Sequence, residues 1–412
     1  MHYSINIKFI TLIASVFLTL VVAPAFAQQS NKPLSFAAQQ TDILLQKTTE
    51  AKASAVKSNL FSPRSLNPDS TLNLVAPNDW CSGFFAGNLW QIYEFSGKPK
   101  WMDQAKTFTQ IMESEQTDGH THDLGFEVYC SVGNAYRLTH NQHYKQVIIQ
   151  AAKTLCTRFN PIVGCIKSWD NNKWKYPVII ENMMNLELLF EATKLSGDST
   201  FYKIAVIHAN TTMKNHFRAD HSSYHVIDYD PETGKVLHKQ TAQGYADGSA
   251  WARGQAWGLY GFTMCYRETG DKAYLTQAED IAQFILNNPN LPKNDVPYWD
   301  YNDPAIPNAP RDASAAAIMA SAFYELSAYS IKSKVYKAAA DKILNSLNNN
   351  YQVSLGADKG FLLLHSTGHK PAGTEIDVPI IYADYYYLEA LLRQKHLKQG
   401  KPVLNTAGTL KY

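Results

Sequence analysis

Apolar and polar positions along this chain follow a repeating pattern. A run that is apolar on most sides ends in a short polar turn, and an amphipathic run follows in which apolar residues recur at helical spacing. A helix that is apolar all round is buried, whereas an amphipathic helix faces water on one side. Each unit is therefore predicted to be an inner helix followed by an outer helix. The turns lie at 95–101, 138–144, 195–201, 268–274 and 329–335.

The repeats predict a closed ring of helices. The amphipathic run 37–56 has no inner run before it, so it can serve as the outer partner of the last inner run. Six hairpins then close into an all-α (α/α)6 barrel. In three of the turns, Gly97, Gly197 and Gly270 stand where a helix C-terminus favours a left-handed residue. The inner runs are expected at 84–95, 127–138, 183–195, 256–266, 313–329 and 382–392.

Two long segments interrupt the repeat, and we expect them to be functional, because long loops in compact domains tend to be. In 218–248, the segments 224–230 and 235–241 flank a Pro-Glu-Thr-Gly turn, which predicts a small β-hairpin. The other segment, 287–310, carries six prolines. No stretch has the composition of a linker, so residues 28–412 are predicted to form one domain.

The first 27 residues are predicted to be a secretory signal peptide. Lys8 precedes the apolar run 9–23, and Ala25-Phe26-Ala27 fits a small-x-small cleavage site. The apolar run is short for a membrane span. The mature protein is therefore expected to be exported to the periplasm, with no membrane partner.

Charge and cysteine content argue against several classes of protein. The chain carries 38 Lys and Arg against 36 Asp and Glu, a net charge of +2 that falls to +1 when the signal segment and its one Lys are removed. This balance offers no basic stripe for nucleic acid or for a membrane surface. The five cysteines fit no zinc motif, so no metal is expected, and we interpret them mainly as small buried hydrophobic residues.

Unusual polar and aromatic residues gather at the predicted starts of the inner helices. Because successive inner helices run in the same direction, their N-termini share one rim, and their dipoles favour an anion there. This arrangement predicts a binding pocket at the rim. The residues are Asp79-Trp80, His122-Asp123, Glu181-Asn182, Trp251 with Arg253, and Arg311-Asp312.

The segment 249–257 indicates what the pocket could bind. Trp251 and Trp257 offer flat apolar faces that can stack on the C–H faces of sugars, and the Arg253 guanidinium matches a carboxylate. Uronic acids combine these two features. The alternative is that the segment holds two core tryptophans and a surface salt bridge.

Two carboxylates are candidates for acid–base chemistry. Asp123 directly precedes an apolar run, and Glu181 stands inside one. Burial would raise the pKa of Glu181 and keep it protonated, as a general acid requires. Either residue could instead be a helix cap or a first-turn acid, as we expect for Asp79 and Asp312.

Three further residues have both a functional and a structural interpretation. His225, on the predicted hairpin, could contact a ligand or be structural, and Gln243 could bind sugar hydroxyls or only tie down its loop. Trp169 could form a wall of the pocket or cover a surface loop.

Seven segments, in order along nearly the whole chain, together resemble the unsaturated glucuronyl hydrolases, glycoside hydrolase family 88. The resemblance implies an (α/α)6 barrel without a cofactor, which acts on oligosaccharides that polysaccharide lyases leave with a 4,5-unsaturated uronic acid at the non-reducing end. It also implies that an acid protonates the ring double bond at C4 and water adds at C5, unlike ordinary glycoside hydrolysis. The segments are 80–90, 122–126, 180–186, 222–225, 243–245, 251–257 and 311–317.

The resemblance also implies roles for single residues. Asp123 resembles a carboxylate that contacts sugar hydroxyls and supports catalysis, and Glu181 stands at the acid/base position, where we expect aspartate. Glutamate moves the carboxylate by about 1.5 Å, and a shift on this scale can cost about a hundredfold in rate. We expect an active enzyme because the rest of the site is present. The implied sugar-binding residues are His225, Gln243, Trp251, Arg253 and Trp257, with His122 and Trp80 as further members.

Two other functions stay open at this point. The glutamate at 181 is compatible with a non-catalytic protein that binds uronate oligosaccharides. A polysaccharide lyase on the same toroid is the other alternative, and a lyase would create the conjugated double bond that the hydrolase destroys.

Overall fold

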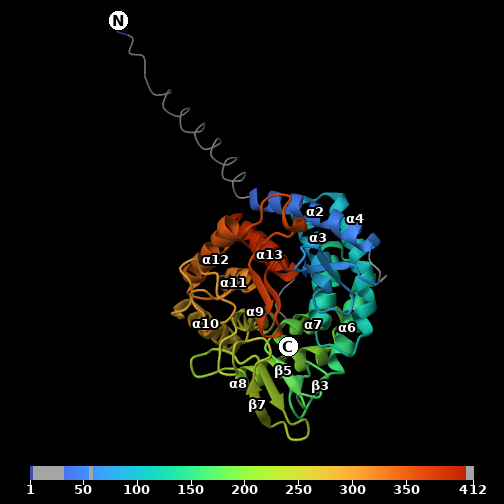
Figure 1. Cartoon of the computed structure of the whole chain (residues 1–412), viewed down its shortest axis with the longest axis vertical. Helices are drawn as coiled ribbons and strands as arrows, with labels where there is room; N and C mark the ends of the chain where they lie inside the picture. Colours follow the sequence, from blue (N-terminus) through green and yellow to red (C-terminus); the bar gives the residue numbers. More distant parts are fainter. Residues whose placement is uncertain (3–31, 55–58, 405–412) are drawn as a thin grey trace.

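Helices arranged in an inner and an outer ring make up the fold (Figure 1). The structure is a computed structural model that describes residues 1–2, 32–54 and 59–404. In this part of the chain each inner element packs against the next, and the contact between α13 and α3 closes the ring. The inner elements are α3 (Ser82–Ser96), η2 (Gly125–Gly133) continued by α5 (Asn134–Thr139), α7 (Asn182–Ser196), α9 (Ala252–Thr269), α11 (Ala313–Leu326) and α13 (Ile381–Lys398).

An outer helix covers each inner element. Five outer helices follow their inner partners along the chain, whereas α2 precedes the ring and packs against both α3 and α13. The predicted (α/α)6 barrel, with the N-terminal run as the sixth outer helix, is therefore confirmed. The outer helices are α2 (Lys32–Ser54), α4 (Pro99–Met112), α6 (Gln142–Cys156), α8 (Ser199–Asn215), α10 (Lys272–Asn287) and α12 (Ser333–Ser346).

Left-handed residues end several inner helices, as the turn sequences predict. Gly97, Gly197 and Gly270 have φ angles of 65°, 79° and 71°, and each donates its N–H to the last turn of its helix. The second turn has no glycine, and His140 takes the same conformation with φ 53°. The turns therefore end the helices at the predicted places, which brings each outer helix back along its inner partner.

The second inner element differs from the predicted α-helix. Its first nine residues, Gly125–Gly133, form a π-helix, and only the last six are α-helical. The backbone here lies so close to α3 that a Cβ atom on Gly83 would be 2.2 Å from the carbonyl oxygen of Glu127. Glycine permits this approach because it has no side chain. π-Helical turns occur often at functional sites, and this one begins two residues after Asp123.

Small antiparallel sheets form in the segments between the helices. The hairpin predicted in 218–248 is present, because β6 (Val226–Tyr229) pairs with β7 (Val236–Gln240). A third strand, β5 (Pro177–Ile179), pairs with β6 and leads directly into α7. The other strand pairs in the described residues are β1 (Ser62–Leu66) with β2 (Leu72–Val75), β3 (Phe159–Asn160) with β4 (Cys165–Ile166), and β8 (Ser366–His369) with β9 (Thr374–Val378).

The remaining short helices lie in connecting segments. They are η1 (Glu113–Thr117), η3 (Leu347–Tyr351), η4 (Asp358–Gly360) and η5 (Lys370–Ala372). All five cysteines are free, and four of them are buried, which agrees with their interpretation as small hydrophobic residues. Beyond its first two residues, the predicted signal peptide lies outside the described residues. No described helix has both the length and the apolar character needed to span a membrane.

Candidate active site

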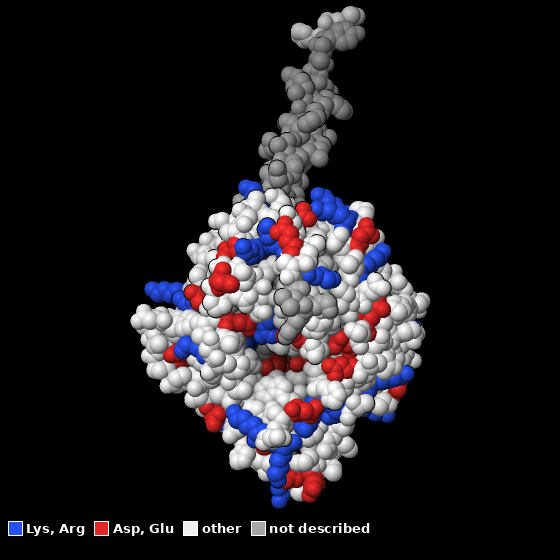
Figure 2. Space-filling model, turned by 45° about the vertical axis from the view of Figure 1, so that its right-hand side comes forward, with Lys and Arg blue, Asp and Glu red and all other residues white. Residues whose placement is uncertain are grey.

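A cavity opens at the rim where the N-termini of the inner helices meet. It contains about 740 Å³ of space between atoms, its mouth included. Figure 2 shows a face of the molecule that is hollowed near its centre, with acidic and basic side chains inside the hollow. Seven of the nine predicted site residues line the cavity, and His122 and His225 lie behind it. The lining residues are Arg64, Trp80, Asp123, Phe126, Trp169, Ile179, Glu181, Ala242, Gln243, Trp251, Arg253, Trp257, Gly368, His369 and Tyr382.

Asp123 enters the cavity just before the π-helix. Its Oδ1 lies 3.3 Å from Nε2 of the buried His122, and its backbone N–H donates to the Thr121 hydroxyl. Burial raises the pKa of the Asp123 carboxyl, His122 opposes this shift, and the negative charge of Glu181 adds to it. Asp123 is thus the carboxyl group of this pair that holds a proton more readily in the free protein.

Glu181 enters the cavity at the start of α7, and His225 lies behind it. The backbone N–H groups of Ala242 and Gln243 lie 3.0 and 3.2 Å from His225 Nδ1. Because these groups can only donate, Nδ1 must accept, and the ring proton sits on Nε2. That atom lies 3.3 Å from Glu181 Oε1. The loop thereby orients the imidazole so that it donates to the carboxylate.

The environment of Glu181 corrects one prediction. Burial on its own would raise the pKa of this carboxyl, but its interaction with His225 outweighs burial, and the pKa is lowered overall. The prediction that burial keeps Glu181 protonated is therefore wrong for the free protein. The sequence did not indicate that a histidine just before strand β6, over 40 residues away, would meet this carboxylate.

Arg253 is also placed differently from the prediction. Its Nη1 atom donates to Asp312 Oδ2 at 2.7 Å and to the Thr367 carbonyl at 2.6 Å, and Nη2 donates to the Gly368 carbonyl at 2.5 Å. The guanidinium is fully buried and its fork is occupied by the protein itself. Only Nε has no partner among the described residues. The salt bridge is thus internal rather than on the surface, and it anchors strand β8 beside the cavity.

The tryptophans differ in how much of each ring is open. Trp251 and Trp257 are 3% and 1% exposed, and Trp257 packs on Phe126 with ring centroids 5.3 Å apart. Trp80 and Trp169 are only partly buried. Trp251 and Trp257 therefore form walls that are also core residues, so both interpretations of that segment hold in part. The more open aromatic faces belong to Trp80 and Trp169.

The other predicted residues tie the site together. The Gln243 side chain lines the cavity and donates to the Gly368 carbonyl at 3.3 Å. Asp312 caps α11 through the N–H groups of Ser314 and Ala315, as expected, while its other oxygen takes the Arg253 bond. Gln243 and Arg253 thus both hold strand β8 at the edge of the cavity.

Sequence reasoning assigned no role to Arg64 or to the residues from β8 and α13. Arg64 is held by Asp79 at 2.9 Å and by Glu375 at 2.8 Å, and its guanidinium lies 5.9 Å from the ring of Trp80. Tyr382 packs against the same tryptophan, with ring centroids 4.9 Å apart. The contacts of Arg64 with Glu375 and of Trp80 with Tyr382 join segments about 300 residues apart, and no local pattern marks them.

Among the described residues, no group of three or more His, Cys, Asp and Glu side chains is arranged to hold a metal ion. The two carboxylates of the cavity are each backed by a buried histidine.

Comparisons with known proteins agree with this geometry. The chain matches Glycosyl Hydrolase Family 88 over residues 62–406. It is 52% identical over 340 residues to an unsaturated glucuronyl hydrolase of Formosa agariphila, covering 81% of this chain and 85% of the relative. It is 33% identical over 336 residues to an unsaturated chondroitin disaccharide hydrolase of Streptococcus pneumoniae, covering 79% and 84%. The crystal structure of an unsaturated glucuronyl hydrolase specific for heparin superposes with a TM-score of 0.83 and 45% identity, over 90% of this chain and 99% of the other.

The fold and the site therefore define a sugar-cleaving enzyme on an (α/α)6 barrel. The chain belongs to glycosyl hydrolase family 88, as the motifs implied. Its activity is the hydrolytic release of an unsaturated uronic acid from oligosaccharides.

Proposed function

We propose that Glu181 is the acid that protonates C4 of the unsaturated uronic acid and that Asp123 is the second catalytic carboxylate. The observation that carries this assignment is the pair of carboxylates in one cavity, each within 3.3 Å of a buried histidine. Their pKa values are displaced in opposite directions, which is typical of residues with separate acid–base roles.

The proton balance of the reaction fits this pair. Transfer of the Glu181 proton to C4 leaves a positive charge at C5 that the ring oxygen shares, and water adds there. The proton released by the water returns to the Glu181 carboxylate. The hemiketal formed at C5 opens, and rearrangement breaks the glycosidic bond. Each turnover therefore consumes one water and regenerates the acid.

Binding of the substrate favours the protonated form of Glu181, which the free enzyme does not favour. In the free enzyme His225 favours ionised Glu181. A uronate brings its own negative charge and displaces water, and both effects raise the pKa of a nearby carboxyl. Glu181 is then protonated in the complex, as the transfer to C4 requires.

Sugar recognition is assigned to the walls of the same cavity. Trp80 and Trp169 offer the partly open faces on which a pyranose can stack. The unpaired Nε of Arg253 and the amide of Gln243 are donors for the carboxylate and hydroxyl groups. The N-termini of α7 and α9 open into the same space and favour an anion there.

The substrates proposed for a first test are disaccharides that lyases produce from glycosaminoglycans, because one relative is specific for heparin and another hydrolyses chondroitin disaccharides. We expect the ultraviolet absorbance of the conjugated double bond to fall when the enzyme meets its substrate. The panel includes hyaluronan, chondroitin and heparin products together with plant and algal uronates. If the absorbance falls with none of these substrates, the proposal is contradicted. Binding without loss indicates a binding protein, and a gain of absorbance from intact polymer indicates a lyase.

The pH dependence of kcat/KM tests the role of His225. If Glu181 must carry a proton, kcat/KM falls as the pH rises through its pKa, and His225 holds that pKa low. His225→Asn keeps an acceptor in the place of Nδ1 but removes the contact with Glu181, so the fall should move to higher pH. His225→Gln keeps a donor in the place of Nε2 and serves as the matched control, with a smaller displacement. A fall that stays in place in His225→Asn would exclude His225 from this role.

We also propose that the protein is exported to the periplasm. The support is Lys8, the apolar run 9–23 and the small residues at 25–27. Mass spectrometry of the mature protein should find an N-terminus at residue 28, and an intact residue 1 would contradict export by this route.

A further inference from the structure

A second cavity lies inside the ring, on the side of Phe126 away from the carboxylates of the active site. It contains about 860 Å³ of space between atoms, its mouth included, and Phe126 lines both cavities. Trp257 and Tyr386 pack with Phe126 in the partition, with ring centroids 5.3 Å apart in each successive pair. The polar residues on its wall include Gln91, three glutamates and two arginines, namely Glu94, Glu187, Glu389, Arg137 and Arg393.

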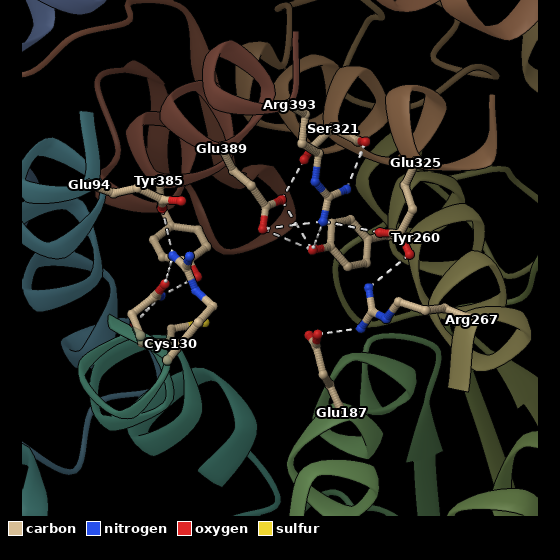
Figure 3. Close-up of polar contacts among 12 residues, drawn as sticks. Glu94, Cys130, Glu187, Tyr260, Arg267, Ser321, Glu325, Tyr385, Glu389 and Arg393 are labelled. Carbon is tan, nitrogen blue, oxygen red and sulfur yellow. Dashed lines mark hydrogen bonds and ion pairs between the residues drawn. The ribbon is translucent and has the colours of Figure 1, made fainter. Parts of the chain in front are cut away.

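Figure 3 shows how the charged side chains at this cavity are arranged. Glu187 from α7 and Glu389 from α13 point toward one another across the open centre of the ring. The Tyr260 hydroxyl donates to Glu389 at 3.0 Å, and Arg393 donates to Tyr260 at 2.8 Å. Glu187 pairs with Arg267 through one oxygen. The acidic groups are thus held in place by a network and not free to turn away.

The charges of this network do not cancel. Three glutamates and two arginines line the cavity, and behind this wall three further glutamates pair with one arginine and one lysine, so two negative charges are in excess over the whole network when all are ionised. The last turns of the inner helices also carry partial negative charge at this end of the barrel. A bound cation would balance both. The pairs are Arg137 with Glu94, Arg267 with Glu187, Glu268 and Glu325, Arg393 with Glu325 and Glu389, and Lys194 with Glu191 and Glu268.

A separate observation points to a ligand with hydrogen-bond donors. Gln91 is only 3% exposed and lines the cavity, yet it makes no hydrogen bond to any described residue, and its Oε1 is buried without a partner. The second oxygen of Glu187 accepts no hydrogen bond from the described residues either, but this side chain is 23% exposed and therefore open to solvent. A buried acceptor without a donor destabilises the folded protein. Buried polar groups in proteins therefore usually have a hydrogen-bond partner.

We propose that this second cavity binds a small organic cation, such as a primary amine. Carboxylates and an unpaired amide oxygen supply acceptors for the ammonium hydrogens, and the rings of Tyr129, Tyr385 and Tyr386 on the cavity wall are available for cation–π contact. A metal ion is the poorer fit, because the acidic side chains in the described residues do not form a group of metal ligands.

The test uses the full-length enzyme with 1,4-diaminobutane, and 1,4-butanediol as its uncharged match. Calorimetry should show one diamine site, and the thermal unfolding temperature should rise by several degrees with increasing diamine, because a ligand that binds only the folded state stabilises it. The diol should do neither. Glu187→Gln and Gln91→Leu should each weaken diamine binding about tenfold or more, whereas Glu191→Gln, on the same helix but outside the cavity wall, should not.

Several outcomes would overturn this assignment. They are an equal response to the diol, no response to the diamine, or unchanged affinity in both cavity variants with normal unfolding temperatures. The two carboxylates of the active site could also attract a diamine, so the titration is repeated with Glu181→Gln. Binding that disappears in that variant places the diamine in the active site and contradicts a second site. None of these results depends on turnover.

Discussion

Replacing Glu181 by glutamine should abolish turnover while the substrate still binds. Glutamine keeps the size and polarity of the side chain but cannot donate a proton to carbon. General acid catalysis contributes about 10²- to 10⁴-fold, so we expect a loss of kcat within that range. The dissociation constant for an unsaturated disaccharide should change only a fewfold, because Glu181 forms one of many contacts in the cavity. Loss of the double-bond absorbance measures turnover, and calorimetry measures binding.

The matched variant is Asp123→Asn, which removes the other carboxylate of the pair. The negative charge of each carboxylate raises the pKa of the other, so this variant should lower the pKa of Glu181 further. We therefore expect activity to survive mainly at acidic pH, with the fall in kcat/KM moved to lower pH. If Asp123→Asn costs more than Glu181→Gln at every pH, the acid is Asp123, whose pKa burial already raises.

Replacing Arg253 by glutamine should destabilise the enzyme by about 3–5 kcal/mol, the usual effect of removing one partner of a buried ion pair. Asp312, which is fully buried, loses the partner of its Oδ2, and two carbonyl groups of β8 lose their donors. The urea midpoint of unfolding measures the loss of stability. Substrate affinity should fall as well, because β8 borders the cavity.

Asp312→Asn and the double variant provide the controls. Asparagine keeps the oxygen that caps α11, so the single change isolates the ion pair from the cap. If Arg253 acts mainly through Asp312, the two single effects will not add in the double variant. Additive effects would show that Arg253 does not act through Asp312. An Arg253→Gln enzyme that keeps normal stability but loses substrate affinity would show that the arginine binds the substrate rather than stabilising the fold.

The partners of Arg253 and Glu181 come from distant parts of the chain, which explains why the functional motifs could be interpreted only in part. The segment around Trp251 and Arg253 indicated a sugar acid, and the residues do line the cavity. Whether an arginine fork faces a ligand or a neighbouring carbonyl depends on β8, which lies more than 100 residues further along the chain. The same holds for Glu181, because its partner His225 is oriented by the loop at 242–243.

The sequence by itself determined the architecture and the position of the site. Helix periodicity and glycine caps are local properties, and six similar units that each bury one apolar helix close into a ring without further information. The rim follows from the common direction of the inner helices. The family motifs also lie within single short segments.

Only the tertiary structure decided the charge states and the remaining contacts. The π-helix packs closely against α3 at Gly83, and the wall around Arg64 depends on Asp79 and Glu375 from separate segments. The second cavity combines helices from the whole ring. A pKa reflects the sum of burial and nearby charges, and those neighbours come from parts of the chain that no local pattern connects.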